Sequence, residues 1–148
     1  RELRVTVRPD GQESWVGAFA APTSDWRFLS ALLTTPDPDA LLVLERGTAF
    51  LGSVRCPQGF RLVDADDEFI GAVSLEGESL LLLVGHVRIV AIGKAGVIWI
   101  SEQLPMDGEV IIDGVIGGRI YGTADPRSEE PMPFQLDMTT GERMTDDE

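Results

Sequence analysis

Short apolar stretches that end at glycine or proline recur through most of this chain, and they constrain its fold more than any other feature. Glycine adopts the positive φ angles that tight reversals need. The pattern therefore predicts a β-meander, in which each strand pairs antiparallel with the strand before it. From residue 41 onward, the expected breaks lie near Gly47, Asp66, Gly77, Gly85, Gly96 and Gly117.

The N-terminal segment has the alternation of a strand with one buried face. Leu3, Val5 and Val7 alternate with polar residues, and a second apolar stretch over residues 14–20 follows a turn at residues 9–11. Alternation with a period of two places successive side chains on opposite faces of a sheet. We expect these two strands to form an antiparallel hairpin.

Two segments in the middle of the chain are apolar on both faces. Leu80 to Val84 is an unbroken apolar run, and residues 87–92 are nearly so. Strands of this kind are typical of positions with cover on both sides. By contrast, Phe134, Leu136 and Met138 alternate with polar residues, which predicts a strand with a single buried face.

One stretch predicts a helix. Ser24 can cap its first turn, apolar residues recur at helical spacing, and Pro36 prevents its continuation. We expect one short amphipathic helix near residues 24–34, which covers a sheet face or edge or presents Trp26 to a partner. The apolar residues of this stripe are Trp26, Leu29, Leu32 and Leu33.

The sequence "FQLDMTTGER" near the C-terminus has the chemistry of a tight turn. The side chains of Asp137 and Thr140 can accept hydrogen bonds from backbone amides of the turn, and Gly141 can take the left-handed conformation. The stretch resembles the end of repeats in quinoprotein-type and related β-propellers, where a strand ending in Leu-Asp enters a turn closed by Thr-Gly. It departs from that pattern at Met144, near which such repeats often have an aromatic residue.

A longer segment, from about Leu80 to Arg143, is similar to a family of uncharacterised bacterial β-rich proteins. The resemblance implies a β-rich fold and no known activity, so no catalytic residue carries over from it. The residues that carry it are Ala95-Gly96-Val97-Ile98-Trp99, Met106-Asp107-Gly108, Tyr121-Gly122-Thr123-Ala124-Asp125 and Pro133-Phe134.

These observations predict an all-β fold with one short helix. A propeller blade is a four-stranded meander of about 40 residues, and residues 97–138 and 41–84 each fit such a unit. Two blades cannot close a ring, so we expect antiparallel meander sheets packed as a sandwich or as one bent sheet, and no closed propeller. We expect residues 1–143 to form a single domain and residues 144–148 to form an acidic, frayed tail.

The charge balance favours some partners over others. The formal net charge is −13, which repels nucleic acid and anionic lipid and attracts a basic protein. The longest apolar run is far shorter than the roughly 20 residues that a membrane helix needs, and no signal-type leader opens the sequence. With Cys56 as the only cysteine, we expect a soluble cytoplasmic protein.

The sequence predicts no catalytic residues, no cofactor and no metal site. His86 is the only histidine, and its place between two apolar strands favours a turn residue over a general base. We expect Cys56 to be buried as a small apolar side chain, and Trp99 to pack in the core. The carboxylates at 64–68 lack the glycine and distal glutamate of a helix-loop-helix calcium loop.

The remaining hypothesis is a non-enzymatic module that binds a basic protein, as an immunity protein neutralises a basic toxin or effector. The alternative is a domain that binds or hydrolyses a small ligand at a carboxylate site between sheets. A solvated face that keeps the protein soluble is the simpler explanation of the acidic residues. The candidate partner-binding residues are Asp64, Asp66, Asp67, Glu68, Glu76, Glu78 and Trp26.

Overall fold

The computed structural model describes residues 2–21, 30–106 and 109–145 of the chain. These residues form fourteen β-strands in four antiparallel sheets, and none of the four sheets closes into a barrel or a propeller. The all-β fold class predicted from the sequence is confirmed. We number the sheets I to IV from the N-terminus.

Each sheet is a meander whose strands follow chain order. Sheet I contains β1 (Leu3–Val7) and β2 (Trp15–Phe19). Sheet II contains β3 (Ala31–Thr34), β4 (Ala40–Glu45), β5 (Thr48–Ser53) and β6 (Arg61–Leu62). Sheet III contains β7 (Phe69–Leu75), β8 (Leu80–Gly85), β9 (Ile89–Gly93) and β10 (Gly96–Ile100). Sheet IV contains β11 (Val110–Ile116), β12 (Arg119–Ala124), β13 (Met132–Asp137) and β14 (Arg143–Met144). Two 3-10 turns lie in connections between strands: η1 (Pro57–Gly59) between β5 and β6, and η2 (Glu76–Glu78) between β7 and β8.

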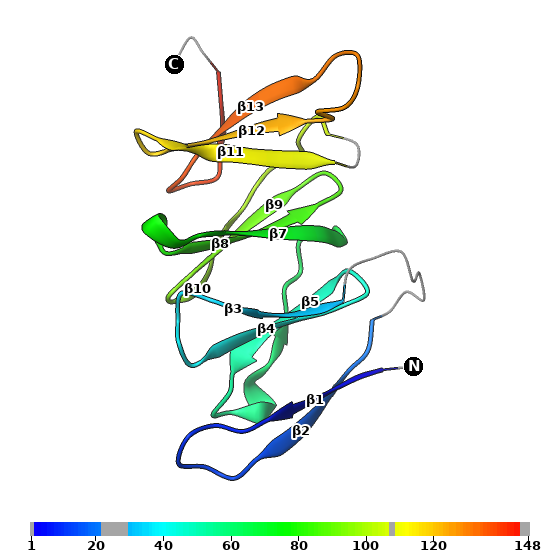
Figure 1. Cartoon of the computed structure of the whole chain (residues 1–148), viewed down its shortest axis with the longest axis vertical. Coiled ribbons are helices and arrows are strands. Elements are labelled where there is room, and N and C mark those ends of the chain that lie inside the picture. Colours follow the sequence, from blue (N-terminus) through cyan, green and yellow to red (C-terminus); the bar gives the residue numbers. More distant parts are fainter. Residues whose placement is uncertain (1, 22–29, 107–108, 146–148) are drawn as a thin grey trace.

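The sheets lie one upon another along the long axis of the molecule, in chain order (Figure 1). This stacking explains strand β8, in which every residue is buried. Leu80 and Leu82 belong to the core shared with sheet IV, whereas Leu81 and Leu83 belong to the core shared with sheet II. The central strands of an inner sheet are covered on both faces, and they are therefore apolar at consecutive positions. The predicted central place of this segment is confirmed.

Two tryptophans each tie the last strand of one sheet to a turn in the next sheet. Trp15 Nε1 on β2 donates to the backbone oxygen of Val54 at 2.7 Å, and Trp99 Nε1 on β10 donates to that of Met138 at 2.8 Å. In both pairs the acceptor lies 39 residues after the tryptophan. The equal spacing shows that β2 and β10 hold equivalent places in a repeated unit. Trp99 is buried in the core, as the sequence predicted.

The C-terminal hairpin has the turn chemistry predicted from "LDMTTG". Asp137 Oδ1 accepts hydrogen bonds from the N–H groups of Thr139 at 2.7 Å and Thr140 at 3.1 Å. The Thr140 hydroxyl accepts one from the N–H of Glu142 at 3.2 Å. Gly141 has a φ of +75°, in the left-handed region that glycine adopts without strain. These contacts satisfy backbone donors that the reversal would otherwise leave unpaired.

Part of the helix predicted near residues 24–34 is a strand. Residues 31–34 form β3, which pairs Leu32 with Val43 of β4, and residues 22–29, with Trp26, lie outside the described part of the chain. Neighbouring leucines are equally compatible with an amphipathic helix and with a strand whose two faces are both partly covered. Pairing with the buried strand β4 decides between the two.

The predicted blade boundaries, at 41–84 and 97–138, are also wrong. The four-stranded units span residues 31–62, 69–100 and 110–144. Every hairpin is marked by the same glycine and proline signals, which do not tell where one sheet ends and the next begins. The outermost strands β6 and β14 have two residues each, and so short a strand shows no alternation.

The end of the described chain is more ordered than predicted. Met144, which was assigned to a frayed tail over 144–148, lies in β14 and is paired with Gln135; residues 146–148 lie outside the described part. Among the described residues, no helix has both the length and the apolar character that a membrane span requires.

Candidate functional site

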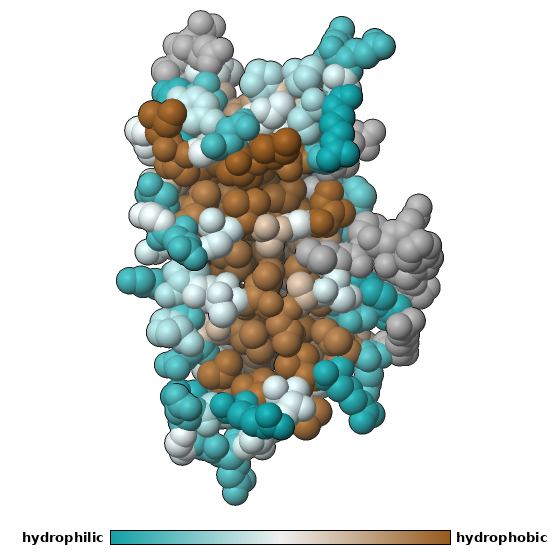
Figure 2. All heavy atoms as spheres, viewed as in Figure 1, coloured by the Kyte–Doolittle hydropathy of each residue, from teal (hydrophilic) through white to brown (hydrophobic). Residues whose placement is uncertain are grey.

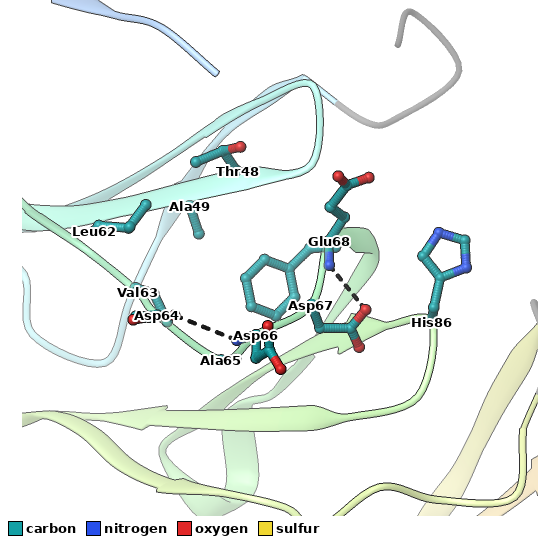
Figure 3. A pocket seen from close by; sticks show the side chains of 11 residues that line it. Thr48, Ala49, Leu62, Val63, Asp64, Ala65, Asp66, Asp67, Glu68 and His86 are labelled. Atoms are coloured by element: carbon teal, nitrogen blue, oxygen red, sulfur yellow. Dashed lines mark hydrogen bonds between the residues drawn. The ribbon is translucent and has the colours of Figure 1, made fainter. Parts of the chain in front are cut away.

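A cavity of about 380 Å³ lies where sheets II and III meet, beside the connection from β6 to β7. Segment 64–68, His86 and Thr48 contribute its polar side chains (Figure 3). Ala49, Val63, Ala65 and Phe69 contribute apolar surface and are themselves buried. The cavity therefore combines an apolar base with several carboxylates and an imidazole.

Asp67 stabilises the wall of the cavity by hydrogen bonds to the backbone. Its Oδ2 accepts hydrogen bonds from the N–H groups of Val87 at 2.9 Å and Arg88 at 3.0 Å, and its Oδ1 accepts one from Glu68 at 2.8 Å. A Cβ added at Gly85 would overlap this carboxylate. Asp67 thus fixes the turn between β8 and β9 against the connection from β6, and its acceptor capacity is largely used.

The neighbouring carboxylates are placed differently. Asp64 and Asp66 are exposed and Glu68 is half-buried. The N–H of Asp66 lies 3.4 Å from Asp64 Oδ1, which makes a weak hydrogen bond. Asp66 has a φ of +51°, so the chain reverses there and sets three acidic side chains along the edge of one cavity.

The predicted acidic set is divided between two ends of sheet III. Segment 64–68 precedes β7, whereas Glu76 and Glu78 lie in the turn η2 that follows it. The seven residues of β7 separate the two groups by roughly 20 Å at the usual strand rise. The structure therefore brings Asp64, Asp66, Asp67 and Glu68 together and places Glu76 and Glu78 elsewhere. Trp26, the last of the predicted partner-binding residues, lies outside the described part of the chain.

The two residues considered for nucleophilic chemistry lie apart. His86 is half-buried in the turn between β8 and β9, on the cavity wall, which agrees with its predicted place in a turn. Cys56 is exposed, and its predicted burial is wrong, because the chain leaves sheet II after β5 and enters the surface turn η1. In the described part of the chain, no three His, Cys, Asp or Glu side chains are grouped to hold a metal ion.

Sequence reasoning missed the contribution of β5 to this cavity. Thr48 and Ala49 lie about twenty residues before the acidic segment and about forty before His86, and they join the cavity only because sheets II and III stack. No local pattern marks such residues, since each reads as an ordinary strand position.

No family model matches this chain, and no curated protein matches it as a relative. The resemblance of residues 80–143 to bacterial β-rich proteins therefore remains a prediction, and the functional argument depends on the cavity and its surroundings.

Proposed function

We propose that this protein is a non-enzymatic binding module that captures a basic segment of another protein, in the way that an immunity protein neutralises a basic toxin or effector. The observation that supports the proposal is the cavity between sheets II and III, with Asp64, Asp66 and Glu68 along an apolar base. A lysine or arginine side chain has the matching chemistry, because its aliphatic stem packs on apolar surface while its charged end stays among carboxylates.

The charge of the whole chain supports the same partner class. A net charge of −13 raises the association rate with a cationic protein and disfavours nucleic acid and anionic membranes. We further propose a cytoplasmic location, since the single cysteine, Cys56, permits no internal disulfide.

The test uses a hexa-arginine peptide as the probe and two variants with the same change in net charge. In Asp64→Asn/Asp66→Asn the charges are removed at the cavity, and in Glu76→Gln/Glu78→Gln they are removed at the far end of β7. We expect the first variant to weaken binding about tenfold and the second less than about twofold. Backbone amide shifts of 64–68 and 86 in an NMR titration report where the peptide sits.

The proposal fails if the two double variants weaken binding equally, because the peptide then senses only the overall charge. It also fails if the affinity does not fall when ionic strength rises from about 0.05 M to 0.5 M, since interactions between exposed charges are screened over that range.

A second candidate function is a small-ligand or hydrolytic site, and one observation favours it: the carboxylates and His86 line the same hollow between two sheets. Methylguanidinium is a suitable probe, because it carries the cationic group without the peptide. If it saturates the cavity as tightly as hexa-arginine does, the small-ligand function holds. Hydrolysis of a chromogenic ester or glycoside that is lost in Glu68→Gln would establish the hydrolytic form.

A further inference from the structure

A second cavity, of about 200 Å³, lies between sheets II and III at the strand ends opposite to the acidic cavity. The acidic cavity includes the first residues of β5, whereas this one includes its last three. The turn from β3 to β4 and the turn from β9 to β10 form its walls and lie at one side of the stack (Figure 1). Figure 2 shows apolar side chains over the middle of this face of the molecule and polar ones toward the strand ends. The cavity therefore lies where apolar core and polar turns meet.

Asp37 is held in position by the turn from β3 to β4. Its Oδ1 accepts a hydrogen bond from the N–H of Asp39 at 2.9 Å, and its backbone oxygen accepts one from the N–H of Ala40 at 3.1 Å. The Thr35 hydroxyl accepts one from the N–H of Asp37 at 3.2 Å. The Oδ2 atom of Asp37 has no partner in the described part of the chain. A fixed carboxylate in the cavity wall therefore keeps one oxygen available as an acceptor.

Lys94 contributes the opposite charge from the other wall. It is the only lysine of the chain and lies in the two-residue turn between β9 and β10. It is exposed and forms no ion pair or hydrogen bond with any described residue, Asp37 included. In a chain with 25 acidic residues, a cavity-lining cation without an acidic partner remains available to an anionic group of a ligand.

The base of the cavity is apolar, and its volume limits the size of a ligand. Leu51 and Ile92, which pack in the core between the two sheets, line it together with Ala40. A closed cavity of about 150 Å³ binds benzene, so about 200 Å³ suits a ligand of roughly eight non-hydrogen atoms. None of the described residues that line it is aromatic, which disfavours a quaternary ammonium group, because such groups bind aromatic faces.

We infer that this cavity binds a small aliphatic zwitterion, an α-amino acid of about the size of valine. The ammonium group of the ligand donates to Asp37 Oδ2, and the ligand carboxylate accepts from the side chain of Lys94. The aliphatic side chain of the ligand packs on Leu51 and Ile92. A simple anion or cation would pair with only one of the two protein charges, whereas a zwitterion pairs with both. The inference concerns a different cavity from the acidic one and does not depend on the proposed function.

The probe is L-valine, compared with two analogues that each lack one of its charges. N-acetyl-L-valine has no ammonium group, and L-valine methyl ester has no carboxylate. Backbone amide shifts of residues 35–40 and 93–96 in an NMR titration report binding at this cavity. We expect saturable binding of L-valine with a Kd on the order of 1 mM, which is within reach of so small a ligand. Each analogue should bind about fivefold to tenfold more weakly.

Two variants assign the two charges. In Lys94→Met, L-valine and its methyl ester should bind with affinities within about twofold of each other, because the carboxylate has lost its partner. In Asp37→Asn, L-valine and N-acetyl-L-valine should do the same. The Asp37→Asn change keeps a side-chain oxygen for the N–H of Asp39, so the turn is retained.

Each variant has a control with the same change in net charge. Asp39→Asn changes a residue of the same turn that does not line the cavity. Arg127→Met changes a side chain that is 86% exposed and follows β12 in sheet IV. Both controls should change the affinity for L-valine less than about twofold.

The inference is overturned if L-valine shows no saturable binding up to about 20 mM, roughly twenty times the expected Kd. It is also overturned if either analogue binds as tightly as L-valine, because the zwitterion is then not what the cavity recognises. Equal losses in the two variants and in their controls would overturn it as well. The hexa-arginine titration uses another probe and other residues, so failure of either proposal is visible without the other.

Discussion

Gly141 gives the sharpest test of how the sheets are locked together. Its φ is +75°, and a Cβ added there would penetrate the ring of Trp99 on sheet III. Gly118 has almost the same φ, +77°, with nothing within 4 Å of the added atom. Gly141→Ala and Gly118→Ala therefore share the backbone penalty, and only the first adds the overlap with Trp99.

The magnitudes follow from these two contributions. An alanine in the left-handed region costs about 1–2 kcal/mol, which applies to both variants. Forcing a side chain into a filled core adds roughly 1–3 kcal/mol, which applies to Gly141→Ala alone. At about 3–4 °C per kcal/mol for a chain of this size, the Tm of Gly141→Ala should lie roughly 3–12 °C below that of Gly118→Ala.

Thermal unfolding followed by far-UV circular dichroism measures this difference. In a Trp99→Leu background the smaller side chain leaves room, so Gly141→Ala should lose most of its excess effect in a double-mutant cycle. Equal Tm losses for Gly141→Ala and Gly118→Ala would refute the reasoning, because the ring would then not be the obstacle.

Two further predictions concern the contacts that fix neighbouring segments. Trp15→Phe removes the donor to the Val54 oxygen, a hydrogen bond that joins sheets I and II. In urea titrations this variant should lower the free energy of unfolding by about 1–3 kcal/mol. An unchanged unfolding midpoint would show that water replaces the indole N–H without loss of stability. Asp67→Ala removes the acceptor of three backbone N–H groups and should cost about 2–3 kcal/mol, whereas Asp64→Ala should stay within about 0.5 kcal/mol. Similar losses for the two aspartates would contradict the structural role given to Asp67.

Local chemistry was enough to predict some features of the fold and not others. The Asp137 turn, the alternation of β1 and the doubly buried strand β8 all follow from a few adjacent residues, and each is confirmed. Strand β3 was predicted to be part of a helix, because four residues without a partner strand carry too little pattern. Its pairing with β4, which the local sequence does not contain, determines its conformation.

The candidate site shows the same division. The acidic segment 64–68 was visible in the sequence as a cluster of carboxylates. The sequence did not show that Asp67 has a structural role while the other acidic side chains of the segment stay accessible. That division depends on the turn between β8 and β9, because the backbone N–H groups of Val87 and Arg88 reach Asp67 only after β7 and β8 pair. The separation from Glu76 also arises from β7, whose extended backbone drives apart residues that are close in sequence.

The amino-acid sequence by itself determined that this chain forms β-strands, where most of them reverse, and that its surface is strongly acidic, because strand periodicity, turn geometry and charge are properties of residues and their near neighbours. Only the tertiary structure decided that there are four stacked sheets, that the first has half the strands of the others, and that two cavities with charged side chains lie between sheets II and III. These features depend on which sheet faces cover one another, and burial between segments tens of residues apart is settled by packing, not by any local preference.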